Sequence, residues 1–151
     1  MSDAAVEVAG LAYRYPDGTQ ALAGVELAIA AGERVAVLGP NGAGKTTLMH
    51  HLNGLLLAQV GTVAIGGLPV AKEHLAQIRR DVGLVFQDPD DQLFMPTVWQ
   101  DVAFGPANEG LRGAALQERV NAALLAVGMT DVAQRPPHHL SFGQRRRVAV
   151  A

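Results

Sequence analysis

Residues 34–46 read Arg-Val-Ala-Val-Leu-Gly-Pro-Asn-Gly-Ala-Gly-Lys-Thr, and this stretch decides the fold. Its first part, Arg34 to Leu38, is a short and mostly apolar run, typical of a strand buried on both faces of a parallel sheet. Its second part, Gly39 to Thr46, matches the pattern G-x-x-x-x-G-K-[ST], and Thr46 to Leu56 predicts a helix directly after it. Glycines let the backbone point several N–H groups at a phosphate, and the helix adds the positive end of its dipole. The stretch therefore predicts a nucleotide-phosphate site in an α/β fold.

The residues at the end of this loop have separate expected roles. We expect Lys45 to reach the β and γ phosphates, the Thr46 hydroxyl to bind the accompanying Mg²⁺, and Thr47 to add a phosphate contact. The alternative is a chance glycine turn before a helix, and the flanking strand and helix argue against it. The predicted ATP-binding residues of the loop are Gly39, Pro40, Asn41, Gly42, Ala43, Gly44, Lys45, Thr46 and Thr47.

Composition limits the class of protein. The chain has 151 residues, of which 49% are hydrophobic and 17% charged, so it is a globular domain or a large part of a bigger one. A net charge of −2 does not favour nucleic acid as a partner. The chain has no cysteine, which excludes disulfides and thiol catalysis. No apolar run is long enough to span a bilayer, and the N-terminus lacks the features of a signal peptide, which predicts a cytosolic chain.

The elements around the loop follow an α/β order and then become helical. Alternating segments on either side of the turn Pro16-Asp17-Gly18 predict an antiparallel start. We predict a nucleotide-binding α/β core over residues 1–90 and a helical part over residues 91–151. The predicted strands are Val6 to Tyr15, Val25 to Ala30, Thr62 to Ile65 and the buried run Val82 to Phe86, and the predicted helices are Lys72 to Arg80, Val98 to Ala103, Ala114 to Val127 and Ser141 to Ala151.

A second motif narrows the class. The residues Leu140-Ser-Phe-Gly-Gln144, followed by three arginines, resemble the L-S-G-G-Q signature of the ATP-binding-cassette (ABC) ATPases, with Phe142 at the third position. At a helix start, the Ser141 hydroxyl and the free N–H groups form an anion site. The resemblance implies that Leu140, Ser141, Phe142, Gly143 and Gln144 contact the ATP held by a partner subunit. An ordinary helix N-cap is the alternative for Ser141.

Two single residues also resemble family positions. Gln87 follows the run Val82 to Phe86 and is similar to the Q-loop glutamine, which contacts Mg²⁺ in the catalytic site and senses the membrane subunit. A solvated turn residue is the alternative. Tyr15 resembles the aromatic residue that stacks on adenine, a task that suits a flat ring. Tyr13 is the rival, because alternation along one strand puts both tyrosines on the same face.

The branch of the family is indicated by the sequence after Gln87. Val85 to Phe94 and Thr97 to Pro106, together with the opening Tyr13 to Thr19, resemble the ATP-binding subunits of energy-coupling-factor importers, especially of the cobalt and nickel type. This resemblance implies a phosphate-loop NTPase core with N-terminal antiparallel strands and a helical signature subdomain. It also implies ATP and Mg²⁺ as cofactors, a second ATPase subunit in a homo- or heterodimer, an integral membrane subunit, and a peripheral position on the cytoplasmic face of the membrane.

The family pattern has a further part that this sequence does not contain. In the family, an apolar strand ending in Asp-Glu follows the signature helix, whereas the sequence ends at Ala151. The glutamate that activates water is therefore absent, and we expect the 151 residues alone to bind ATP but not to hydrolyse it usefully. We also expect the runs Arg34 to Leu38 and Val82 to Phe86 to lack a sheet neighbour and the chain alone to be poorly stable.

Other readings of the sequence are open but weaker. Asp88, Asp90 and Asp91 do not fit an EF-hand and predict an acidic turn that caps the next helix. The pairs His50-His51 and His138-His139 are not expected to bind metal, and Arg145 to Arg147 predicts a solvated helix face or a subunit contact. The rival functions are a non-transport ABC protein of DNA repair or translation, a nucleotide-binding module without turnover, and a phosphotransferase.

Overall fold

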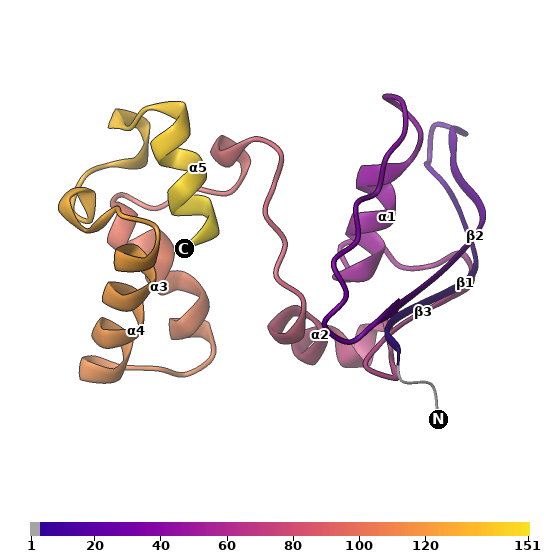
Figure 1. The fold of residues 1–151 in the computed structure, drawn as a ribbon, viewed down its shortest axis with the longest axis horizontal. Helices are drawn as coiled ribbons and strands as arrows, with labels where there is room; N and C mark the ends of the chain where they lie inside the picture. Colours follow the sequence, from indigo (N-terminus) through magenta and orange to yellow (C-terminus); the bar gives the residue numbers. More distant parts are fainter. Residues whose placement is uncertain (1–3) are drawn as a thin grey trace. The chain divides into compact units, whose positions relative to one another are not determined.

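The first unit of the chain is built on an antiparallel sheet. The computed structural model describes residues 4–151, which fold as two units, Met1–Leu84 and Val85–Ala151. In the first unit the strand order is β2-β1-β3-β4, with β1 at Ala4–Arg14, β2 at Gln20–Ala30, β3 at Val60–Ile65 and β4 at Leu68–Pro69 (Figure 1). All neighbours pair antiparallel, so the predicted antiparallel start is confirmed.

The turn between β1 and β2 is closed by its own polar groups. The backbone N–H of Tyr15 donates to the carbonyl of Thr19 at 2.9 Å, and the N–H of Thr19 donates to Asp17 Oδ1 at 2.8 Å. The second bond holds the pKa of the Asp17 carboxyl below its usual value, because an N–H donor favours the charged form. Pro16, Asp17 and Gly18 therefore form the turn that the sequence predicts, and the turn fixes the β1–β2 pairing.

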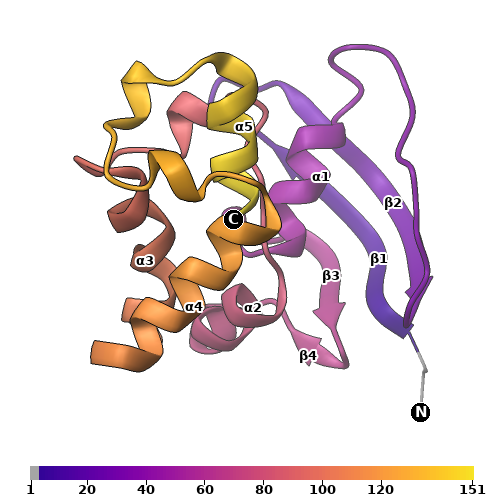
Figure 2. The ribbon, with the colours of Figure 1, turned by 60° about the vertical axis from the view of Figure 1, so that its left-hand side comes forward.

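Helix α1, Lys45–Leu52, packs on one face of this sheet, as Figure 2 shows. The helix ends at Leu52, before the predicted Leu56, because Asn53 and Gly54 form a turn in which Gly54 has a φ of +71°. The predicted helix Lys72 to Arg80 is a 3₁₀ turn, η1 (Lys72–His74), followed by α2 (Leu75–Asp81). The core between sheet and α1 consists of Val8, Leu11, Leu22, Leu48 and Val63.

The two predicted parallel strands are not formed. Neither Arg34 to Leu38 nor Val82 to Phe86 pairs with a strand among the described residues. Val35 and Leu38 are 45% and 88% exposed, which agrees with the expectation that this run lacks a sheet neighbour. A parallel strand needs hydrogen bonds to neighbouring strands, which are connected to it by long crossover segments. The four strands of the described sheet pair antiparallel with one another, so neither run has a parallel partner among them. An apolar run was therefore insufficient to predict a buried strand.

The second unit is helical, as predicted. Its helices are α3 (Val98–Asn108), α4 (Gly113–Ala126) and α5 (Phe142–Val150), with the 3₁₀ turns η2 (Pro89–Asp91), η3 (Thr130–Val132) and η4 (Pro137–His139) between or before them. Helix α3 packs against α4 and α5 (Figure 1). The buried core that they share consists of Val98, Val102, Ala103, Val120, Leu124, Met129, Val132, Leu140 and Val148.

Over residues 4–151, the structure has no helix that is both long and apolar enough to cross a membrane.

Candidate phosphate and signature sites

The glycine that precedes α1 sets the shape of the loop. Gly44 has a φ of +85°, a conformation that L side chains rarely adopt, and it stands as the N-cap of α1. A Cβ at this position would lie 2.4 Å from the carbonyl oxygen of Ala21 and 2.9 Å from Leu22 Cδ2, both in β2. The glycine therefore allows the loop to turn while its backbone lies directly on the sheet.

The loop has unpaired N–H groups, as an anion site requires. In the described chain, the loop closes on itself through Ala43 N–H, which donates to the carbonyl of Pro40 at 3.3 Å, and the N–H groups of Asn41, Gly42, Gly44 and the first three residues of α1 have no partner. These donors fit the oxygens of a phosphate, and α1 has no acidic residue in its first turn to compete for them. The residues present therefore fit a bound nucleotide phosphate.

Lys45 folds back over the same loop. Its Nζ donates to the carbonyl oxygens of Gly39 and Pro40, at 2.7 Å each. These two contacts hold the ammonium group above the loop that carries the free N–H groups. A phosphate bound to the loop would therefore meet a positive charge that is already in place.

Tyr15 and Thr47, which are distant in sequence, are in contact. The Tyr15 and Thr47 hydroxyls lie 3.0 Å apart, and the Tyr13 and Tyr15 rings pack edge to face with centroids 5.1 Å apart. Thr47 is buried, whereas Thr46 is exposed at the N-terminus of α1. The structure thus brings Tyr15 to the phosphate loop, while Tyr13 contacts the ring of His51.

His51 supports Thr47 from below and was not predicted. Its ring is fully buried, and Nδ1 donates to the Thr47 carbonyl at 2.8 Å, since a carbonyl can only accept. Tyr13 packs on the same imidazole, with centroids 4.8 Å apart. The signal in the sequence was the spacing of four residues between Thr47 and His51, which puts both on one helix face.

Gln87 lies in the second unit, exposed in a bend. The turn that follows it is capped by Asp88, whose Oδ1 accepts the N–H of Asp90 at 3.0 Å. Asp88 therefore caps the short η2, which the acidic residues themselves form, whereas the predicted helix, α3, is capped by Thr97.

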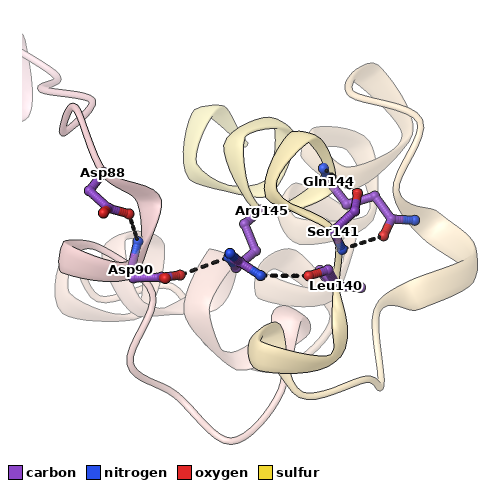
Figure 3. Close-up of polar contacts among 6 residues, drawn as sticks. All are labelled: Asp88, Asp90, Leu140, Ser141, Gln144 and Arg145. Carbon is purple, nitrogen blue, oxygen red and sulfur yellow. Dashed lines mark hydrogen bonds and ion pairs between the residues drawn. The ribbon is translucent and has the colours of Figure 1, made fainter.

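Leu140 to Gln144 form the start of α5. Ser141 is the N-cap, its Oγ accepts the N–H of Gln144 at 3.3 Å, and its own N–H donates to Gln144 Oε1 at 2.9 Å (Figure 3). This capping box uses the serine oxygen as an acceptor and leaves its O–H free to donate. Leu140 is buried in the helical core, whereas Phe142 is half exposed and Gly143 has open space where a Cβ would stand.

Two side chains between η2 and α5 were not predicted. Arg145 and Gln92 both bridge the two segments, although the sequence indicated a solvated helix face or a subunit contact for the arginine. A partner 55 or 57 positions away leaves no local pattern in a sequence, so neither contact was predictable from periodicity.

The fold and the glycine loop define a phosphate-loop nucleotide-binding domain, and known proteins define its family. Residues 22–151 match the family described as "ABC transporter". The chain therefore belongs to the ABC transporter family.

Several relatives show which part of a protein the chain resembles. A putative ABC transporter ATP-binding protein of Streptomyces avermitilis is 68% identical over 151 residues, which is 100% of this chain and 58% of that protein. The energy-coupling factor transporter ATP-binding protein EcfA of Methanothermobacter thermautotrophicus is 55% identical over 97% of this chain and 48% of its own length. The solved structure of CbiO1 from Clostridium perfringens, described as part of the ABC transporter complex CbiONQ, is 41% identical with a TM-score of 0.83, covering 99% of this chain and 60% of that one. The chain thus spans about half to three fifths of these relatives.

Proposed function

We propose that this chain is the ATP-binding part of an ABC transporter ATPase and that it holds Mg-ATP on the loop Gly39 to Thr47. The observation that carries the proposal is the loop itself, with its unpaired N–H groups and Lys45 Nζ held over them. In this proposal Lys45 binds the β and γ phosphates, Thr46 and Gln87 provide oxygen ligands for Mg²⁺, and Mg²⁺ supplies charge neutralisation.

The base and the γ-phosphate are assigned to other residues. Tyr15 stacks on adenine in this proposal, which is supported by its contact with Thr47 in the loop. The residues Leu140 to Gln144 bind the γ-phosphate of an ATP held by a second ATPase subunit, with Ser141 donating its hydroxyl and α5 its first N–H groups. Closure of two subunits on two ATP molecules is then the step that drives transport.

The transporter branch is proposed from the relatives. EcfA proteins and CbiO1 support an energy-coupling-factor importer with an integral membrane partner, and hence a peripheral position on the cytoplasmic face of the membrane. We propose cobalt or nickel as the transported ion from the resemblance of Val85 to Pro106. We also propose that the whole protein hydrolyses ATP, as an ABC transporter ATPase does.

A binding experiment tests the phosphate site. The sequence has two lysines, so Lys45→Ala can be compared with Lys72→Ala, which removes the same charge from an exposed 3₁₀ turn. We expect Lys45→Ala to weaken Mg-ATP binding about 100-fold, since two charge-assisted contacts of about 1.5 kcal/mol or more are lost. Lys72→Ala should bind like the wild type in isothermal titration calorimetry. Full ATP affinity in Lys45→Ala would refute the proposed site.

A transport experiment tests the proposed cargo. Cells that lack the gene should lose uptake of radioactive cobalt or nickel, and the wild-type gene should restore it while Lys45→Ala should not. Normal uptake of both ions in cells without the gene would refute the metal assignment and leave the ATP-binding proposal standing.

A further inference from the structure

The turn after Gln87 is linked to the first turn of the signature helix, α5. Arg145 Nε lies 2.7 Å from Asp90 Oδ1, and Arg145 Nη1 donates to the carbonyl of Leu140 at 2.6 Å (Figure 3). The arginine side chain is 18% exposed and the Asp90 side chain is 62% exposed, so water reaches this ion pair from the carboxylate side while the guanidinium group is largely covered. A single guanidinium group therefore joins η2 to the residue before Ser141.

A second bridge fastens the same segment to the far end of the helix. Gln92 Nε2 donates to the carbonyl of Ala149 at 2.6 Å, and Gln92 Oε1 accepts the N–H of Phe86 at 3.2 Å. The stretch from Phe86 to Gln92, which contains Gln87, is thus held at two points along α5. A displacement of this stretch is transmitted to α5 rather than absorbed between the two segments.

The chemistry of Arg145 suits such a link. Its planar fork presents its N–H donors in a fixed geometry, so it holds Asp90 and the Leu140 carbonyl in one relative orientation, which the flexible ammonium group of a lysine would fix less firmly. The Leu140 carbonyl lies directly before Ser141, the N-cap of α5. Because Arg145 holds this carbonyl, it also helps to orient the Ser141 hydroxyl relative to the helix.

We propose that Arg145 is a positioning residue for the signature. Arg145 links Ser141 to the acidic turn Asp88 to Asp91, so that the signature moves when this turn moves. The inference rests on the proposed function, in which Ser141 contacts ATP. It predicts that breaking the link reduces turnover but not the first binding of ATP to the phosphate loop.

The test is steady-state ATP hydrolysis by the full-length protein with its membrane partner. We expect Arg145→Met, which keeps an apolar stem, to lower kcat about tenfold with KM for ATP within about twofold of the wild type. Arg145→Lys should fall between the two, and Asp90→Asn should lower kcat about threefold. Because both partners serve one link, Asp90→Asn should have little further effect in the Arg145→Met background.

Arg147→Met is the matched control. Arg147 is exposed on the same helix, and no hydrogen bond or ion pair joins its side chain to another described residue, so the kcat of the variant should stay within about twofold of the wild type. The inference is overturned if Arg145→Met retains wild-type kcat, if Arg147→Met reduces kcat equally, or if the effects of Asp90→Asn and Arg145→Met multiply. It is also overturned if Arg145→Met acts only through a raised KM or a lowered Tm.

Ser141→Ala separates this inference from the proposed function. If Ser141→Ala lowers kcat and Arg145→Met does not, the signature assignment stands and the link is refuted. If Ser141→Ala leaves kcat unchanged, the proposed signature is wrong and the inference falls with it.

Discussion

The two units differ in how far along the chain the packing partners of their apolar segments lie. In the second unit, α3, α4 and α5 bury their apolar faces against one another, and Leu124 is only 1% exposed. In the first unit, the antiparallel sheet and α1 also enclose a core, but the apolar run Arg34 to Leu38 leaves Leu38 88% exposed. Helices and hairpins find partners nearby, whereas a parallel strand depends on remote ones. An apolar run is therefore buried only where the segment that it packs against is present.

The largest expected effect on stability comes from replacing one leucine by alanine in each unit. Leu124→Ala should cost about 2–5 kcal/mol of unfolding free energy because it opens a cavity, and Leu38→Ala should change it by less than about 0.5 kcal/mol. Trp99 is the single tryptophan and packs against the helical core, so its fluorescence during urea unfolding reports on the second unit, and far-ultraviolet circular dichroism followed in parallel also reports on the first unit, which contains Leu38. A similar loss in both variants would show that Leu38 is buried in solution and would break the comparison.

A second pair of substitutions compares a glycine of the phosphate loop with a glycine of α5. Gly44→Ala should weaken Mg-ATP binding about tenfold or more, because a left-handed Ala costs about 1–2 kcal/mol and its Cβ would clash with the Ala21 carbonyl. Gly143 lies in α5 with open space around it, so Gly143→Ala should stabilise the second unit by up to about 1 kcal/mol. Nucleotide titration and Trp99 fluorescence measure the two effects. Destabilisation by Gly143→Ala would mean that this space is filled in solution.

The smallest expected effect is a pH dependence confined to the β1–β2 turn. The pKa of Asp17 is lowered by the N–H of Thr19, so the stabilisation is present above the ordinary value of 3.8 and is lost as the pH falls through the lower folded-state value. In NMR spectra, the protection of the Thr19 amide, taken relative to the intrinsic exchange rate at each pH, should fall on acidification, and Asp17→Ala should leave this amide unprotected at every pH. Equal amide exchange in wild type and Asp17→Ala would contradict this role.

The sequence predicted the parts of the molecule that depend on local patterns. Pro16-Asp17-Gly18 marked the turn that pairs β1 with β2, and the spacing of Val98, Val102 and Leu124 marked helices that bury those residues. The strand expected at Arg34 to Leu38 is not formed, because an apolar run does not show whether a partner strand is present.

The candidate site also divides into parts that the sequence predicted and parts that it did not. The glycine loop and the serine cap were readable from short motifs, and their backbone geometry follows from those residue types. The contact of Tyr15 with Thr47 and that of Arg145 with Asp90 join positions far apart in the sequence. Only the folded backbone brings such pairs together, so one sequence could not distinguish Tyr15 from Tyr13 or a linking arginine from a solvated one.

The most direct test of the central claim is hydrogen exchange of the full-length protein with and without Mg-ATP. We expect slower exchange of the amides of Asn41, Gly42, Gly44 and residues 45–47, which have no partner before a phosphate accepts from them, and no change in α4. Saturating Mg-ATP that left these amides unchanged, or protected only the second unit, would contradict the central claim.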